Sequence, residues 1–111
     1  MSNKIRYYHF GRLVSNHKGI ITICSTVDDS GLLKMGFSFC KKNTTYIRKF
    51  HNKIAYSRML LEKTCLTTPF TGKSIVDIYN FYETLKTISN NFIPKSFLKF
   101  NLTTKCAKVQ V

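Results

Sequence analysis

Residues 33–40 (LKMGFSFC) alternate between two kinds of side chain. The odd-numbered positions carry large apolar side chains, namely Leu33, Met35, Phe37 and Phe39. The even-numbered positions are mostly small or polar, namely Lys34, Gly36, Ser38 and Cys40. Since successive side chains of a strand point to opposite faces, this pattern predicts a β-strand with one core face. Gly36 between large neighbours indicates a bulge or the close approach of another group, with sheet curvature as the simpler explanation.

Two further strands are predicted before this one. Residues 4–14 are rich in aromatic and β-branched side chains, and residues 20–27 (IITICSTV) form a β-branched run. Residues 15–19 (SNHKG) and 28–31 (DDSG) supply the turn formers between the runs. The first forty residues therefore predict an antiparallel meander.

The periodicity becomes helical from about Thr45, which is a suitable N-cap. At ~100° per residue, five side chains fall on one stripe that we expect to pack on the sheet. They are Ile47, Phe50, Ile54, Ser57 and Leu61. The opposite side of this helix gathers Arg48, Lys49, Asn52, Lys53, Tyr56 and Lys63.

A second helix is predicted from Ser74, with Asp77 placed for a capping box. Its apolar stripe comprises Ile75, Ile78, Tyr79, Tyr82, Leu85 and Ile88. Residues 66–72 (LTTPFTG) read as a loop, and residues 89–91 (SNN) as the end of the helix. The tail, residues 101–111, either adds an edge strand or hangs free.

These elements predict one α+β domain spanning residues 1–111. Its sheet is an antiparallel three- to four-stranded β-meander with one face covered by two α-helices. At the level of fold this resembles small single-strand-binding domains of the β-meander-plus-helix kind, including Whirly-like domains. No apolar run approaches ~20 residues, and the first ten residues lack the apolar core of a signal peptide. We expect a cytoplasmic protein with no membrane partner.

The positive net charge of the chain indicates which class of molecule it binds. The 111 residues contain 18 Lys and Arg against 5 Asp and Glu, a formal net charge of +13. Residues 40–63 hold seven of these cations, with Glu62 as their only acid, whereas an ordinary exposed helix mixes signs to form i,i+4 pairs. Unpaired cations together with many Tyr and Phe favour binding of a phosphate polymer, single-stranded DNA or RNA.

Residues 35–60 (MGFSFCKKNTTYIRKFHNKIAYSRML) resemble a small, uncharacterised family of phage-encoded proteins. The resemblance rests on a GxxFC strand end, an aromatic residue, an Arg-Lys pair and an I-A-x-x-R helix segment. Here these are Gly36, Phe39, Cys40, Tyr46, Arg48, Lys49, Ile54, Ala55 and Arg58. The sequence departs from the family pattern at His51 and Asn52. The resemblance implies a viral or mobile-element origin, and hence the host cytoplasm, but no particular activity.

Catalytic and metal chemistry find little support. Cys24, Cys40, Cys65 and Cys106 form no C-x-x-C pair and read as buried thiols, so no metal or cofactor is expected. Residues 71–74 (TGKS) lack the earlier glycine of a phosphate-binding loop, although a helix N-terminus can still hold one phosphate. Asp28 and Asp29 suit a turn, with a metal-dependent nuclease as the alternative. Cys40 with His51 would be a nucleophile and base only if the fold brought them together, and His51 is expected as a polar contact on the basic helix.

The leading hypothesis is a non-enzymatic nucleic-acid-binding protein that prefers single strands. Its predicted contact residues are Arg6, Tyr8, Phe10, Lys34, Lys41, Lys42, Arg48, Lys49, Lys53 and Arg58. Arg6, Tyr8, Phe10 and Lys34 are assigned to an uncovered sheet surface. A competing assignment makes Tyr8 and Phe10 core and exposes Ile5 and Tyr7. Arg58 has a second interpretation, a guanidinium bonded to a backbone carbonyl.

The alternative function is a small phage-made inhibitor or adaptor. It would bind an acidic or nucleic-acid-binding surface of a host protein through the same basic helix face. The sequence leaves a homodimer open.

Overall fold

The computed structural model describes residues 4–11, 20–41, 45–87 and 93–94. Within these ranges the chain forms, in order, β1 (Arg6–Gly11), β2 (Ile20–Val27), β3 (Leu32–Cys40), α1 (Arg48–Leu60), β4 (Leu66–Pro69) and α2 (Ser74–Thr87). The strands make one sheet of order β1-β2-β3-β4, and every neighbouring pair is antiparallel. The predicted α+β class and the antiparallel meander are confirmed.

The turn between β2 and β3 follows from its sequence. An Asp28 carboxylate oxygen accepts hydrogen bonds from the backbone N–H groups of Ser30 and Leu32, at 2.9 and 3.0 Å, and from the Ser30 hydroxyl at 2.7 Å. Gly31 adopts a φ of 85°, a conformation that residues with a Cβ rarely take. This turn sets the register in which Ile23 pairs with Phe37 and Cys24 with Gly36.

The main hydrophobic core lies between the sheet and α2. The sheet contributes buried side chains from three strands, namely Phe10, Ile21, Ile23, Leu33, Met35 and Phe37. Helix α2 contributes Ile78, Tyr82 and Leu85. The apolar stripe predicted for this helix is therefore confirmed over its described members, and its last residue, Ile88, lies outside the described residues.

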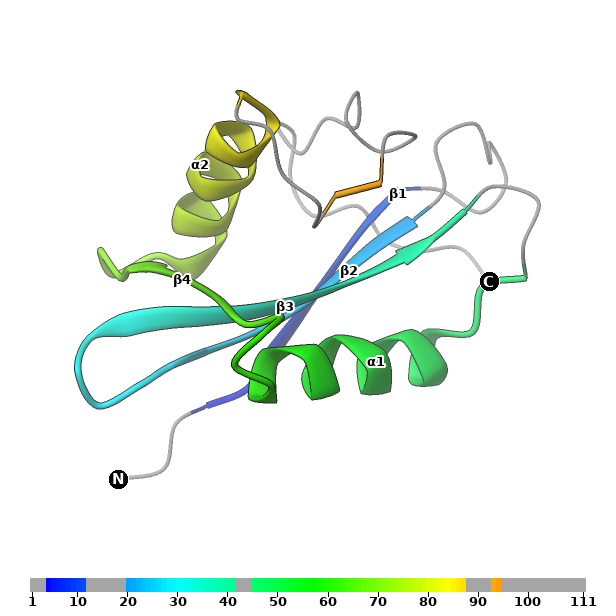
Figure 1. Cartoon of the computed structure of the whole chain (residues 1–111), viewed down its shortest axis with the longest axis horizontal. Coiled ribbons are helices and arrows are strands. Elements are labelled where there is room, and N and C mark those ends of the chain that lie inside the picture. The colour runs from blue at the N-terminus through cyan, green and yellow to red at the C-terminus, as the bar shows by residue number, and fades with distance from the viewer. Residues whose placement is uncertain (1–3, 12–19, 42–44, 88–92, 95–111) are drawn as a thin grey trace.

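The two helices lie on opposite faces of the sheet, which corrects the expectation that both cover one face (Figure 1). The second face carries Cys24, which packs with Ala55 and Met59 of α1 in a separate cluster. This face of β3 looks like a solvent face in sequence because its residues are small or polar. Small residues also allow a helix to come close, and that is their role here.

Two local expectations also need correction. Residues 66–69, expected in a loop, form β4, in which the β-branched Thr67 and Thr68 pair with Lys34 and Leu33. Pro69 is tolerated because β4 is an edge strand of the described sheet. The N-cap of α1 is Ile47, which makes no side-chain capping bond, rather than Thr45. Residues 89–91 and the predicted tail strand lie outside the described residues.

No helix in the described ranges has the length and apolar character needed to cross a bilayer.

Candidate nucleic-acid interface

Helix α1 reaches the sheet at Gly36. A Cβ at this position would lie under 3.0 Å from backbone atoms of Ala55 and Met59. Real Cβ atoms do not approach a backbone this closely, so a larger residue would push the helix away. Gly36 therefore marks a close approach, by α1 of the same chain.

A buried polar layer then fixes the rotation of α1 about its own axis. The Ser38 hydroxyl and Nδ1 of His51 are hydrogen bonded at 2.6 Å, and Nε2 of His9 lies 2.7 Å from the Asn52 amide oxygen. The ring of Tyr46 stacks on His51, with centroids 5.2 Å apart. Polar groups out of water must be paired, so these bonds favour one orientation of the helix.

Burial changes the ionisation of this layer. It lowers the pKa of His9 and of His51, and the positive charges of Arg48 and Arg58 lower them further. The Asn52 side chain opposes this effect at His9. Burial also raises the pKa of the Cys24 thiol to about 11, which keeps it protonated. These groups are arranged to stay neutral.

The face of α1 that meets the sheet is not the predicted stripe. The buried residues are His51, Ala55 and Met59, spaced i, i+4, i+8 along the helix. Ile47, Phe50 and Leu61, which were expected to pack inward, are more than half exposed, and Ser57 is exposed as well. The shallow, small-residue surface around Gly36 accepts Ala55, and Ser38 offers His51 a hydrogen bond that an apolar stripe could not use.

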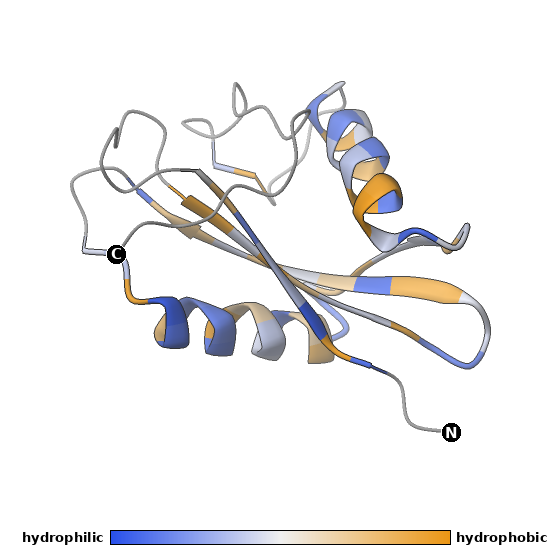
Figure 2. Cartoon of the chain, turned by 180° about the vertical axis from the view of Figure 1, so that it is seen from behind, coloured by the Kyte–Doolittle hydropathy of each residue, from blue (hydrophilic) through white to orange (hydrophobic). Residues whose placement is uncertain are grey.

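This rotation places apolar and positive side chains together on the solvent side of the helix. We call this set the outer surface of α1: Ile47, Lys49, Phe50, Lys53, Leu60 and Leu61. Arg48, three residues before His51, is exposed at the start of the helix but lies on its sheet side, near enough to His9 to lower the pKa of that ring. Figure 2 shows hydrophilic and hydrophobic residues interspersed along α1. Among the described residues the one ion pair is Lys86 with Glu83, on α2. Arg48, Lys49 and Lys53 therefore face solvent uncompensated.

The predicted contact residues of β1 occupy a different place from the one expected. Phe10 is 3% exposed in the main core, and Tyr8 is partly buried against it, donating a 3.0 Å hydrogen bond to Ser74. Ile5 and Tyr7 are exposed. The competing assignment is thus the one observed, because β1 turns Tyr8 and Phe10 toward α2.

Arg6 and Lys34 do not share a surface. Arg6 pairs with Ser25, which pairs with Met35, so Arg6 lies on the α2 side of the sheet. Lys34 lies on the α1 side, half-buried. The expected uncovered sheet surface joining these residues to Tyr8 and Phe10 is wrong, because a helix covers each face.

Four of the six remaining predicted cations lie on α1, namely Arg48, Lys49, Lys53 and Arg58. Lys41 is exposed just after β3, and Lys42 lies outside the described residues. The Arg58 guanidinium donates a 2.9 Å hydrogen bond to the carbonyl of Phe37, in line with its structural interpretation. Lys49 and Lys53 are the predicted residues that lie together on the side of α1 away from the sheet, and Arg48 is exposed at the start of the same helix.

The structure also locates the candidate catalytic groups. His51 is buried and bonds Ser38, so it is no surface contact. Asp28 serves the turn, where hydrogen bonds from Ser30 and Leu32 lower its pKa. Cys24 and Cys40 are buried and Cys65 is half-buried. No three His, Cys, Asp or Glu side chains of the described ranges cluster as metal ligands do.

Residues 71–74 lead into α2 as predicted, with a different capping pattern. The two carboxylate oxygens of Asp77 accept hydrogen bonds from the backbone N–H and the hydroxyl of Thr71, at 2.8 and 2.6 Å. Ser74, at the first helical position, accepts instead from Tyr8. Asp77 thus ties the loop to the helix, three residues earlier than a capping box at Ser74 would require.

The exposure of Phe50, Ile47 and Leu61 was not predicted from the sequence. The available signal was the i, i+4, i+8 spacing of His51, Ala55 and Met59. These side chains suit contact with Gly36 and Ser38, on the small and polar side of β3.

Searches of protein-family models, curated proteins and solved structures found no match to this chain.

Proposed function

We propose that this protein binds single-stranded nucleic acid through the outer surface of α1. The observation that carries the proposal is the pair of exposed, uncompensated cations Lys49 and Lys53 on this surface, with Arg48 exposed at the start of the same helix. Three like charges within two turns repel one another. A phosphate backbone would relieve that repulsion and release counterions on binding.

Phe50 supplies the aromatic surface that Tyr8 and Phe10 cannot. Its side chain is 56% exposed and lies between Lys49 and Lys53 in sequence. A base stacked on an aromatic ring gains ~1–3 kcal/mol, and an unpaired strand can present its bases in this way. Phosphate contacts to the lysines with stacking on Phe50 favour single strands over duplex. The phage or mobile-element origin proposed for the protein rests on the resemblance of residues 35–60.

The test is fluorescence anisotropy with a labelled single strand of about 16 nucleotides, at salt concentrations from about 50 to 200 mM. We expect log K to fall linearly with log salt, by ~0.7 for each phosphate neutralised. Phe50→Ala should weaken binding by roughly 1–3 kcal/mol and leave this slope unchanged.

A matched pair of charge variants locates the site. The double variant Lys49→Glu/Lys53→Glu should lose most of the affinity and reduce the salt slope by ~1.4. The control Lys34→Glu/Lys73→Glu makes the same charge change outside α1 and should keep the slope. Equal losses in both doubles would mean that net charge alone drives binding, and no binding at the lowest salt would reject the function.

A second candidate is supported by the apolar members of the outer surface. Ile47, Leu60 and Leu61 are each more than half exposed. Aliphatic side chains contribute nothing to the binding of phosphate groups. An acidic host protein with an apolar patch would use both the lysines and these residues. Affinity purification with nuclease treatment separates the two functions. Retention of one stoichiometric acidic protein after treatment supports the inhibitor or adaptor, and its absence supports nucleic acid.

A further inference from the structure

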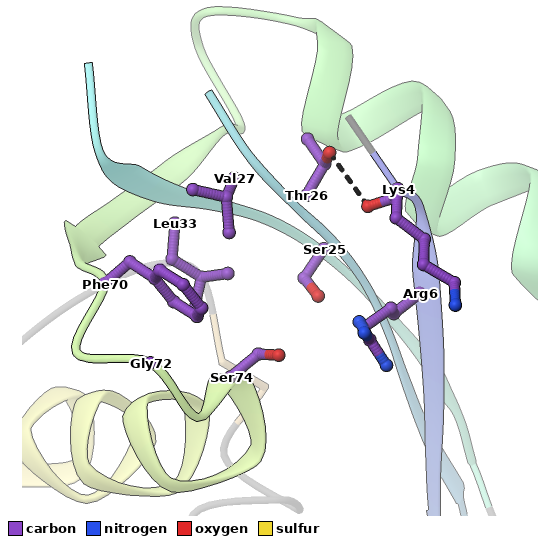
Figure 3. Close-up of a pocket in the computed structure, with 9 residues that line it drawn as sticks. All are labelled: Lys4, Arg6, Ser25, Thr26, Val27, Leu33, Phe70, Gly72 and Ser74. Carbon is purple, nitrogen blue, oxygen red and sulfur yellow. Dashed lines mark hydrogen bonds between the residues drawn. The ribbon is translucent and has the colours of Figure 1, made fainter. Parts of the chain in front are cut away.

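A cavity of about 230 Å³ lies on the α2 side of the sheet, away from the outer surface of α1. It is bounded by the start of β1, the end of β2 and the loop that enters α2 (Figure 3). Its polar wall is formed by Lys4, Arg6, Ser25 and Ser74. Val27, Leu33 and Phe70 form an apolar wall. The cavity therefore offers two distinct environments to one small ligand.

Ser25 is the observation that indicates a ligand. The residue is 1% exposed, and its hydroxyl oxygen has no hydrogen-bond partner. Within the described residues it is the buried side-chain polar atom left unpaired. Figure 3 shows this hydroxyl directed toward the space between Ser74 and Arg6. Native proteins rarely leave such a group unpaired, so an occupant that bonds it is expected.

The charges around Ser25 specify the sign of the occupant. Arg6 is the direct cross-strand partner of Ser25, and Lys4 lies two residues before Arg6. Both cations line the cavity, and both are exposed, so their side chains can turn toward a ligand. The guanidinium fork of Arg suits the oxygens of an oxyanion.

Helix α2 adds donors to the same cavity. Its 14 residues begin at Ser74, and the first N–H groups of a helix have no partner within it. The N–H groups of Val76 and Asp77 bond the Lys73 carbonyl, which leaves those of Ser74 and Ile75 to donate. The Ser74 hydroxyl already accepts from Tyr8, which leaves its own hydrogen to donate. Gly72, with φ 111°, lines the cavity, and no atom lies within 4 Å of where its Cβ would be. The acid of this turn, Asp77, directs both oxygens to Thr71.

We infer that this cavity binds a phosphate group, as inorganic phosphate or as the phosphate of a small phosphomonoester. Arg6 and Lys4 neutralise its charge, while the hydroxyls of Ser25 and Ser74 and the backbone N–H groups of Ser74 and Ile75 donate to its oxygens. The apolar wall at Phe70 would contact the organic part of a monoester. This site is independent of the function proposed for α1, which lies on the other face of the sheet.

The test is a titration of the full chain with sodium phosphate and, separately, phenyl phosphate at constant ionic strength. Calorimetry gives the Kd, and amide chemical shifts locate the site. We expect saturable binding with shifts at Gly72, Ser74 and Ser25. Tighter binding of phenyl phosphate identifies a monoester as the ligand, and equal binding identifies phosphate alone. No saturation by either compound up to about 10 mM would overturn the inference.

Three variants make the test specific to this cavity. Ser25→Ala should raise the Kd about fivefold or more, and Arg6→Gln about tenfold or more. Lys49→Gln, on the outer surface of α1, should leave the phosphate Kd within about twofold while it weakens nucleic-acid binding. Unchanged affinity in both cavity variants would reject the site.

Stability separates a binding role of Ser25 from a structural one. In phosphate-free buffer, Ser25→Ala should melt at the same temperature as the wild type or higher, since the hydroxyl it removes has no partner. A lower melting temperature would mean that the hydroxyl is already satisfied inside the protein, and would count against a ligand there.

Discussion

At the scale of single residues, His9 and His51 stabilise the fold as neutral rings. They lie between α1 and the sheet, where His51 is bonded to Ser38 and His9 to Asn52. The pKa of each is lowered from 6.5, first by burial and then by a neighbouring arginine. In the unfolded chain both rings return to about 6.5. Between the folded and unfolded pKa values the unfolded state binds more protons, so acid favours unfolding.

We therefore predict that the free energy of unfolding falls as the pH decreases through about 6.5, and continues to fall toward the folded pKa values. Urea unfolding at pH about 7.5 and about 5.5 measures this change. In His51→Gln the fall should be smaller, whatever the stability of the variant at neutral pH, because one titrating ring is gone. Equal stability of the wild type at both pH values would contradict this arrangement.

At the scale of elements, the sequence predicts β1, β2, β3 and α2 because each of their patterns has one interpretation, whereas the four-residue β4 was expected as a loop. Leu33 to Phe39 alternate as a strand with one apolar face does, although both faces of β3 are covered. The stripe Ile78, Tyr82 and Leu85 has no apolar competitor on α2. Helix α1 and its two caps carry two candidate stripes, the more apolar one from Ile47 to Leu61 and the buried one of His51, Ala55 and Met59. Only the tertiary contact at Gly36 decides between them. The sheet face that carries Gly36 was expected to be uncovered for the same reason, and α1 covers it.

The candidate site could be predicted only where it does not depend on tertiary contacts. Lys49 and Lys53 are exposed under either rotation of α1, so the sequence could predict them as contacts. Tyr8 and Phe10 depend on which face of β1 meets α2, and Phe50 depends on the rotation of α1. The cavity at Ser25 joins β1, β2 and the start of α2, and no local pattern indicates such a meeting.

The rotation of α1 predicts that two alanine substitutions on this helix change the free energy of unfolding by very different amounts. Phe50→Ala should change the free energy of unfolding by no more than ~0.5 kcal/mol, since this ring is mostly exposed. Met59→Ala should cost ~2–5 kcal/mol, because Met59 is 4% exposed and packs on Cys24. Urea unfolding of both variants measures the contrast. A larger loss for Phe50→Ala would restore the stripe predicted from periodicity.

At the scale of the whole molecule, a net charge of +13 opposes folding through self-repulsion. The chain extends 39 × 29 × 26 Å. At ~0.01 M salt the Debye length is ~30 Å, so cations on both sides of the sheet repel one another. At ~0.15 M it is ~8 Å, and repulsion is confined to neighbours such as Arg48, Lys49 and Lys53.

We predict that sodium chloride raises the melting temperature over this range, most steeply at its lower end. The variant Lys49→Gln/Lys53→Gln should gain less from salt than the wild type, because it has less repulsion to screen. Sodium phosphate at matched ionic strength should add a further increase, since a bound ligand stabilises by RT ln(1 + [L]/Kd). Arg6→Gln should lose that addition and keep most of the chloride effect. Scanning calorimetry separates the two contributions: screening depends on ionic strength alone, whereas the cavity distinguishes phosphate from chloride. A melting temperature that falls with sodium chloride would contradict self-repulsion, and identical curves in the two salts would contradict the cavity.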